Sequence, residues 1–224
     1  CSSDLEVILA RAASAEAYFS SIAENWDSLR ALHFPNEAIE DTLLDLAGPG
    51  PYRRVVDFGT GTGRMLMLFS GLAAESEGID FSHRMLTVAR ANLERAGVNN
   101  SRVRFGDVTA APFDDASADL VIVHQVLHYL DTPGDAIGEA ARVLMPGGRL
   151  LVIDFAPHDL EFLRADHGHR RLGVRHDALA EWAAQAGLKL EAPRSFDPPT
   201  PGAPGLTVNI WRASKPALSK ARAA

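Results

Sequence analysis

The chain has 224 residues, of which 46% are hydrophobic and 23% charged, as in an ordinary soluble globular protein with one large core. Its 29 acidic residues outnumber the 22 basic ones, and the net charge of −7 argues against a surface built for nucleic acid. One cysteine excludes an internal disulfide and a multi-cysteine metal site. No apolar run approaches the roughly 20 residues of a membrane span, and no signal peptide opens the chain, so we expect a cytoplasmic protein without a membrane partner.

Helical spacing of apolar residues dominates the first part of the chain. It runs through residues 3–47 in three segments, the last from Ile39 to Leu46. Gly-Pro-Gly-Pro at 48–51 stops that segment. We therefore expect residues 1–50 to form an N-terminal helical cap.

From Arg53 onward, short apolar runs alternate with helical patterns. The runs are typical of buried strands and the intervening patterns of amphipathic helices. This alternation predicts an α/β fold with a doubly wound, mostly parallel sheet. We expect strands at 54–58, 77–80, 102–105, 118–123 and 149–154, and helices at 65–72, 82–97 and 136–144.

The pattern loosens after Asp154. Residues 156–175 are rich in His, Arg and Asp, and predict a polar lid loop with one helical turn around 159–163. A helix over 178–186 and two strands, 188–196 and 206–213, complete the predicted domain, which we bound at 51–214. Residues 215–224 are expected to be a frayed tail.

Three glycines on alternate positions follow the first predicted strand, in VVDFGTGTGR at 55–64. The dinucleotide fingerprint G-x-G-x-x-G fails here, because its third glycine would fall on Arg64 or Leu66. The phosphate loop also fails, since no Gly-Lys pair occurs in the chain. Asp57 precedes the glycines, and its carboxylate would repel a pyrophosphate but suit an ammonium group.

Two further acids end the next two strands. Asp80 lies where a doubly wound fold places a ribose-binding carboxylate, and Asp107 could receive an exocyclic amino group beside the amide of Val108. Three strand ends thus offer groups for an amine, a ribose and an adenine, without a phosphate receptor. S-adenosylmethionine combines those parts.

Each acid also has a structural interpretation. Asp80 competes with Ser82 for the N-cap of the 82–97 helix, and Gly106-Asp107 is a common turn pair. His128 follows His124 by four residues, so one helical face could hold both. His128 is then either a catalytic base or a packed structural histidine. The histidines and acids of 158–169 match no zinc spacing, and we expect no metal.

Residues 53–155 resemble the core of class I S-adenosylmethionine-dependent methyltransferases. VVDFGTGTG, GIDFS and GDVTAAPF are similar to the motifs that end the first three strands. ADLVIVHQVLHYL and EAARVLMPGGRLLVIDF are similar to the fourth strand with its loop and to the helix, turn and fifth strand. The resemblance implies a Rossmann-like sheet of seven strands in the order 3-2-1-4-5-7-6, with the seventh antiparallel.

The resemblance also implies roles for residues. The cofactor set is Asp57, Gly59, Thr60, Gly61, Gly63, Asp80, Phe81, Met85, Gly106, Asp107, Val108, His124 and Gln125, with S-adenosylhomocysteine as the product. His128 is the candidate base, and the acceptor is a small molecule. The candidate substrate and lid residues are Tyr18, Trp26, Arg30, His33, His158, His167 and His169.

The segments that flank the core, at 17–35 and 156–174, resemble a bacterial subgroup in which this domain follows an ArsR-type winged helix. We therefore consider two candidate partners, a preceding winged-helix domain and a second copy of the chain. The alternative function is a domain that senses S-adenosylmethionine or S-adenosylhomocysteine for such a regulator, without turnover. The sequence does not identify the methyl acceptor or the atom that is methylated.

Overall fold

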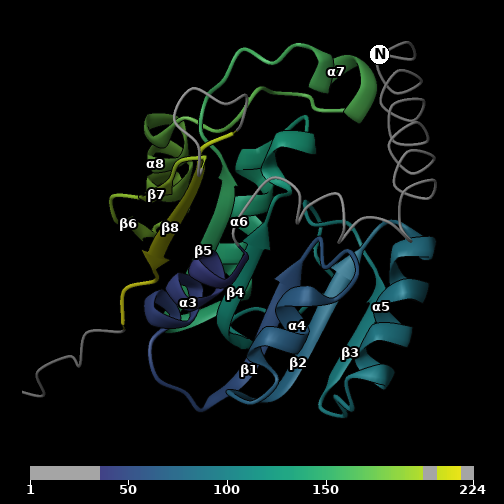
Figure 1. Ribbon diagram of the computed structural model, residues 1–224. Coiled ribbons are helices and arrows are strands. Elements are labelled where there is room, and N and C mark those ends of the chain that lie inside the picture. The colour runs from purple at the N-terminus through teal and green to yellow at the C-terminus, as the bar shows by residue number, and fades with distance from the viewer. Residues whose placement is uncertain (1–35, 199–205, 218–224) are drawn as a thin grey trace, which may run out of the picture.

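The computed structural model describes residues 36–198 and 206–217 (Figure 1). Seven strands follow one another across a single sheet in the order β3-β2-β1-β4-β5-β8-β6, and the short β7 pairs with β8. Their bounds are β1 Tyr52–Phe58, β2 Ala73–Asp80, β3 Ser101–Phe105, β4 Ala118–His124, β5 Leu144–Phe155, β6 Lys189–Leu190, β7 Arg194–Phe196 and β8 Val208–Ser214. The predicted doubly wound sheet is confirmed.

The pairing directions also match the expectation. The strands run parallel to one another from β3 through β2, β1 and β4 to β5, whereas β8 is antiparallel to β5. The predicted strand at 188–196 is divided into β6 and β7, both of which pair with β8. Pro193 lies between the two pieces and has no amide hydrogen to donate, which accounts for the break.

Helices cover both faces of this sheet. Alternate side chains of each central strand point to opposite faces, so Val55 and Val56 of β1 enter different cores. One core packs α6 (Pro133–Val143) and α8 (His176–Gln185) against the sheet, and the other packs α3 (Asn36–Ala47) and α4 (Arg64–Phe69). A third, smaller cluster joins α4 to α5 (His83–Arg95).

Several predicted elements differ in extent from those observed: α6 begins three residues before its predicted start, and β2 and β5 begin four and five residues before theirs. The segment 65–72 yields α4, which ends at Phe69 because the amide of Leu72 turns back to the carbonyl of Phe69. The turn expected around 159–163 is instead α7, Phe162–His167. Of the predicted helical cap, only α3 lies within the described residues.

The carboxyl ends of the parallel strands meet at one edge of the sheet, and α7 lies beyond that edge (Figure 1). In an open α/β sheet, ligands bind in the crevice outside these strand ends. This edge is therefore where a site is expected. Within the described residues, no helix is both long and apolar enough to cross a membrane.

Candidate active site

The glycine loop packs tightly between two neighbouring strand ends. Gly59, Gly61 and Gly63 have φ of 72°, 52° and 83°, the left-handed region that glycine enters without strain. The amides of Gly59 and Thr60 each donate to the carbonyl of Ile79 at 2.8 Å. A Cβ on Gly59 would lie only 2.4 Å from Cγ2 of Val126. The loop therefore joins the end of β2 to the segment that follows β4.

Two buried carboxylates flank this loop. Asp57 in β1 is 1% exposed, and Asp80 at the end of β2 is 8% exposed. One oxygen of Asp80 accepts from the amide of Gly61 and the other from the amide of Ser82, both at 2.9 Å. Burial raises the pKa of Asp80, and these amide hydrogen bonds oppose the rise. Asp80 thus helps to hold the glycine loop in place.

The structure resolves which residue caps α5. The hydroxyl of Ser82 accepts from the amide of Met85 at 3.3 Å, so Ser82 is the N-cap and Asp80 is not. Met85 itself is 2% exposed in the first turn of this helix. Phe81, between the acid and the cap, is half-buried. Asp80 remains available for the ribose-binding role that its position predicts.

The end of β3 is tied to the end of β2. The amide of Gly106 donates to the carbonyl of Asp80 at 3.1 Å, and Val108 is buried in the sheet core. The carboxylate of Asp107 is exposed and accepts from the amide and hydroxyl of Thr109, both at 2.8 Å. Its side chain therefore stabilises a turn here, and an adenine role for Asp107 stays a prediction.

The segment after β4 has unusual backbone geometry. Gln125 has a φ of 56°, a conformation that a non-glycine residue seldom adopts outside turns and functional sites. Its amide donates to the carbonyl of Ile153 at 2.7 Å, which fixes it beside β5. His124 ends β4, whereas His128 lies in a short 3-10 helix, Leu127–Tyr129. The two histidines therefore do not share a helical face, because the chain turns between them.

His128 is paired with a carboxylate that the sequence analysis did not single out. Nδ1 of His128 lies 2.7 Å from Oδ1 of Asp154, and the two side chains are 1% and 0% exposed. Asp154 also accepts from the amide of Phe155 at 2.8 Å. Strand pairing explains the contact, since β4 and β5 are parallel, Asp154 lies near the carboxyl end of β5, and His128 lies in the 3-10 helix that follows β4. Asp154 ends an apolar strand as Asp57 and Asp80 do, a signal that could have identified it.

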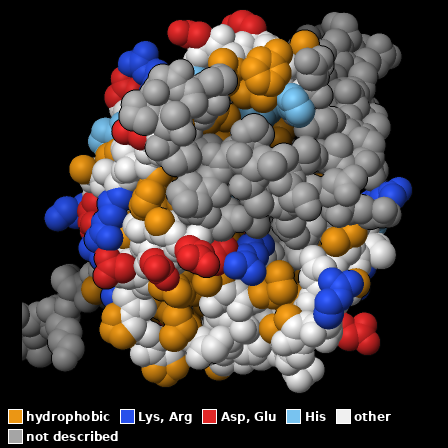
Figure 2. Space-filling view, in the orientation of Figure 1, with side chains coloured by type: hydrophobic (Ala, Val, Ile, Leu, Met, Phe, Trp, Pro, Cys, Tyr) orange, Lys and Arg blue, Asp and Glu red, His pale blue; other side chains and the backbone are white. Residues whose placement is uncertain are grey.

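The predicted lid folds over His128. The amides of Arg170 and Arg171 donate to the carbonyl of His128 at 2.8 and 3.2 Å. His158 is anchored through its amide to the carbonyl of Leu172 at 3.2 Å. Figure 2 shows histidine and hydrophobic side chains gathered at the end of the molecule where α7 lies in Figure 1.

Two lid histidines join His128 in one cluster. The ring of His169 lies 4.3 Å from that of His128 and 6.5 Å from that of His158, between centroids. Burial lowers the pKa of His169 to about 2, and burial also lowers the pKa of His158. His167 ends α7 and its ring contacts Phe162 edge-on. Tyr18, Trp26, Arg30 and His33 lie outside the described residues.

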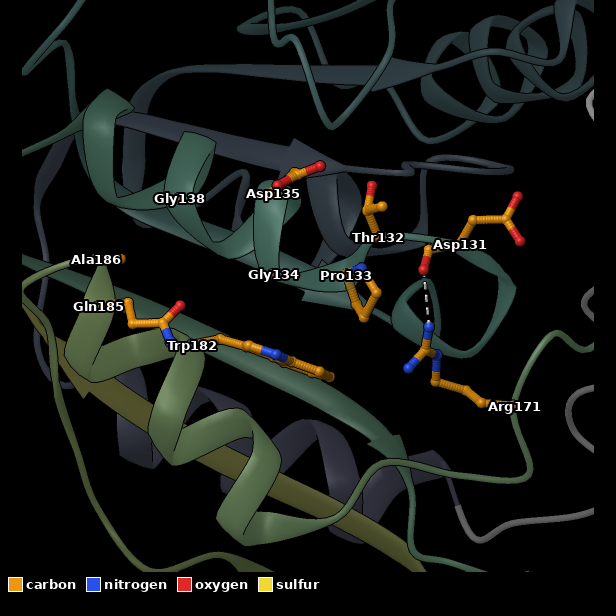
Figure 3. Close-up of a pocket in the computed structure, with 10 residues that line it drawn as sticks. All are labelled: Asp131, Thr132, Pro133, Gly134, Asp135, Gly138, Arg171, Trp182, Gln185 and Ala186. Atoms are coloured by element: carbon orange, nitrogen blue, oxygen red, sulfur yellow. Dashed lines mark hydrogen bonds between the residues drawn. The ribbon is translucent and has the colours of Figure 1, made fainter. Parts of the chain in front are cut away.

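A separate cavity of about 510 Å³ lies between α6 and α8 (Figure 3). Arg171 crosses its mouth and donates to the carbonyls of Leu130 and Asp131 at 2.9 and 3.2 Å. No predicted site residue lines it; the lining is Asp131, Thr132, Pro133, Gly134, Asp135, Gly138, Arg171, Trp182, Gln185 and Ala186. Within the described ranges, no group of three or more His, Cys, Asp or Glu is arranged to hold a metal ion.

Residues 56–152, which carry the glycine loop, the strand-end acids and His128, match the family described as "Methyltransferase domain". The match covers 97 of the 224 residues, somewhat less than half of the chain. Over 141 residues the chain is 35% identical to YcgJ, an uncharacterised methyltransferase of Bacillus subtilis, covering 58% of this chain and 54% of that protein. Over 145 residues it is 37% identical to a demethylmenaquinone methyltransferase of Thermus thermophilus, covering 62% of this chain and 64% of the relative.

Solved structures share the fold. The structure of YcgJ has a TM-score of 0.68 at 22% identity and covers 79% of this chain and 97% of its own. A geranyl diphosphate C-methyltransferase from Streptomyces coelicolor, in complex with Mg²⁺, geranyl diphosphate and S-adenosylhomocysteine, has a TM-score of 0.67 at 17% identity. That match covers 80% of this chain and 77% of the other. At these identities the likeness establishes the architecture of the domain.

Proposed function

We propose that the chain is an S-adenosylmethionine-dependent methyltransferase that acts on a small-molecule acceptor. The observation that carries this proposal is the packing of Gly59 against Val126. Val126 is two residues before His128, so this contact places the glycine loop against the segment that carries the buried His128–Asp154 pair. A cofactor loop and a candidate base thus share one edge of the sheet.

The residues at this edge suit S-adenosylmethionine. The carboxylate of Asp57 suits the ammonium group of the methionine part, and that of Asp80 suits the ribose hydroxyls. Gly106 and Val108 lie next to Asp80, where an adenine ring is expected. When bound, S-adenosylmethionine supplies an activated methyl group on a sulfonium, so the protein chiefly aligns the two reactants.

His128 is the proposed general base for an acceptor that must lose a proton. Asp154 accepts from Nδ1, which leaves Nε2 of the neutral ring with its lone pair. The same carboxylate would stabilise the imidazolium after proton transfer. His158 and His169 from the lid would close over the acceptor.

The names of the similar proteins do not identify the acceptor of this chain, because one names demethylmenaquinone and another geranyl diphosphate. The net charge of −7 favours a small molecule over nucleic acid. A preceding ArsR-type winged helix and a second copy of the chain remain the proposed partners. With such a regulator, the alternative function would be cofactor sensing without turnover.

Calorimetric titration tests the cofactor. S-adenosylmethionine and S-adenosylhomocysteine should both bind, and NAD⁺ should not. The Asp80→Ala variant should lose most of this affinity, whereas Glu75→Ala, which removes an exposed carboxylate from the same strand, should keep it. Circular dichroism shows whether Asp80→Ala still folds. Absence of adenosyl binding in the folded parent chain would contradict the proposal.

Turnover separates the enzyme from the sensor. His128→Asn should reduce methyl transfer by about 10²–10⁴-fold, the usual contribution of a general base, and should leave cofactor affinity nearly unchanged. Unchanged turnover would remove His128 from the mechanism. Cofactor binding with no transfer to any acceptor would favour the sensing alternative.

A further inference from the structure

Three imidazole nitrogens are buried near one another and have no hydrogen-bond partner among the described residues. They are Nε2 of His128, Nε2 of His158 and Nδ1 of His169. The rings of His128, His158 and His169 all pack against Phe155, with centroids 5.0, 6.3 and 6.0 Å from its ring. Leaving a buried polar group unpaired destabilises the folded state, so three in one place call for an explanation.

The partners of the other ring nitrogens define two tautomers. Nδ1 of His128 carries a hydrogen toward the Asp154 carboxylate, so Nε2 of the neutral ring is an acceptor. Nδ1 of His158 accepts from the amide of Leu160 at 3.3 Å, so its hydrogen is on Nε2. The cluster therefore presents one buried acceptor and one buried donor.

These tautomers restrict what the cluster binds. A metal ion needs a lone pair from each ligand, and Nε2 of His158 carries a hydrogen while Nδ1 accepts from the backbone. A ligand that satisfies both rings must instead donate to His128 and accept from His158. It must also keep a lone pair if it is to attack a methyl group.

We propose that the methyl acceptor is a hydroxyl compound, whose O–H donates to Nε2 of His128 and whose oxygen accepts from Nε2–H of His158. This assignment rests on the proposed methyltransferase function. Oxygen has two lone pairs, so one accepts from His158 and the other attacks the methyl carbon. A neutral amine has only one lone pair, which the His158 bond would occupy. A thiol bonds weakly in both directions. In a carbon acid the reacting C–H is a poor donor to His128, and the oxygen that could accept from His158 is not the atom that is methylated.

The proton and charge balance follows from the same contacts. The acceptor oxygen forms a bond to the methyl carbon as the carbon–sulfur bond breaks, and the electron pair of that bond goes to sulfur. The hydroxyl proton moves to Nε2 of His128, whose new positive charge lies against Asp154. His169 remains neutral beside them, so it does not repel the imidazolium. His158 donates Nε2–H to the acceptor oxygen and orients it, so it is a catalytic residue that acts by positioning.

The experiment labels the acceptor and identifies the methylated atom. The full chain is incubated with S-adenosylmethionine carrying ¹³C in its methyl group and a protein-free extract of the cells that carry the gene. Carbon NMR separates O-methyl from N-, S- and C-methyl products. An O-methyl product is expected. A methyl group on nitrogen, sulfur or carbon would overturn the inference but leave methyl transfer standing, whereas no labelled product would contradict the proposed function itself.

Variants then test the donor. His158→Phe keeps a ring but removes the N–H, and should lower kcat on the labelled acceptor by about 10-fold, the effect of one lost hydrogen bond that positions the oxygen. His158→Gln restores an N–H donor and should recover much of that loss. KM for S-adenosylmethionine should be unchanged in both, which a collapsed lid would not allow. Equal kcat for His158→Phe and the parent chain would overturn the role of His158.

Discussion

Two separate constraints, backbone conformation and close packing, act on the single residue Gly59 at the end of β1. It needs both its positive φ of 72° and the absence of a Cβ, which would meet Val126 at 2.4 Å. Gly97 has a similar φ of 68° but open space around it. The pair therefore separates the cost of backbone strain from the cost of close packing.

Gly59→Ala should destabilise the fold more than Gly97→Ala. Both pay a left-handed backbone cost of about 1–2 kcal/mol, and Gly59→Ala adds an overpacking cost of about 1–3 kcal/mol. Urea unfolding measures both. Val126→Ala in the Gly59→Ala background should restore the packing part, as a double-mutant cycle. Equal losses for the two glycine variants would show that Val126 yields at no cost.

His169 links the site to pH. Burial, assisted by the nearby His128 and His158, lowers its pKa to about 2. The unfolded chain takes up a proton near pH 6.5 that the folded chain does not, so acidification below that pH favours unfolding. The resulting loss of unfolding free energy reaches about 1.4 kcal/mol per pH unit for one histidine.

Urea denaturation at pH 7, 6 and 5 tests this sign. The parent chain should lose stability on acidification faster than His169→Phe, which removes the titrating group. His83→Gln, a change at an exposed histidine, should follow the parent chain. Parallel curves for the parent chain and His169→Phe would mean that His169 is protonated in the folded state.

At the scale of elements, the lid is held by backbone hydrogen bonds to the strand ends. The amides of Arg170 and Val174 donate to the carbonyls of His128 and Phe155, both at 2.8 Å. Gly173 lies in this segment with a φ of 86°, and a Cβ there would be 2.2 Å from the carbonyl oxygen of Ala156. Because the obstacle is backbone, no side-chain rotation can relieve it.

Gly173→Ala should therefore detach the lid from the strand ends. Hydrogen exchange at the amides of Arg170 and Val174 should accelerate, while amides in β1 and β4 stay protected. Gly168→Ala is the matched control, since Gly168 has a φ of 68° and no atom of the described residues lies within 4 Å of its missing Cβ. Equal exchange at those two amides in both variants would show that the lid accommodates the methyl group.

Sequence and structure agree most closely where the signal is local. The sheet follows from buried apolar runs, and the glycine loop from three glycines and an acid within seven residues. The His128–Asp154 pair could not be read in this way, because its members are 26 residues apart and meet only when β4 and β5 pair. The lid depends on contacts to the carbonyls of His128 and Phe155, which no local periodicity encodes.

At the scale of the whole molecule, the proposed cofactor residues come from strands far apart in sequence but adjacent in the sheet. Asp57, Asp80, Val108 and Gln125 lie on or directly after β1, β2, β3 and β4. Binding that depends on all four requires the whole sheet to be formed. A ligand of this kind stabilises the whole fold against global unfolding and does not act on one loop alone.

Thermal unfolding makes this measurable. S-adenosylhomocysteine at about 100 times its Kd should add about 2.7 kcal/mol, which raises Tm by about 5–11 °C for a domain of this size. NAD⁺ at the same concentration should leave Tm unchanged, and Asp80→Ala should abolish the shift. Exchange of core amides in β1, β4 and β5 should slow together, because they open only in global unfolding. Protection confined to the glycine loop would instead mean that the loop binds ligand independently of the sheet.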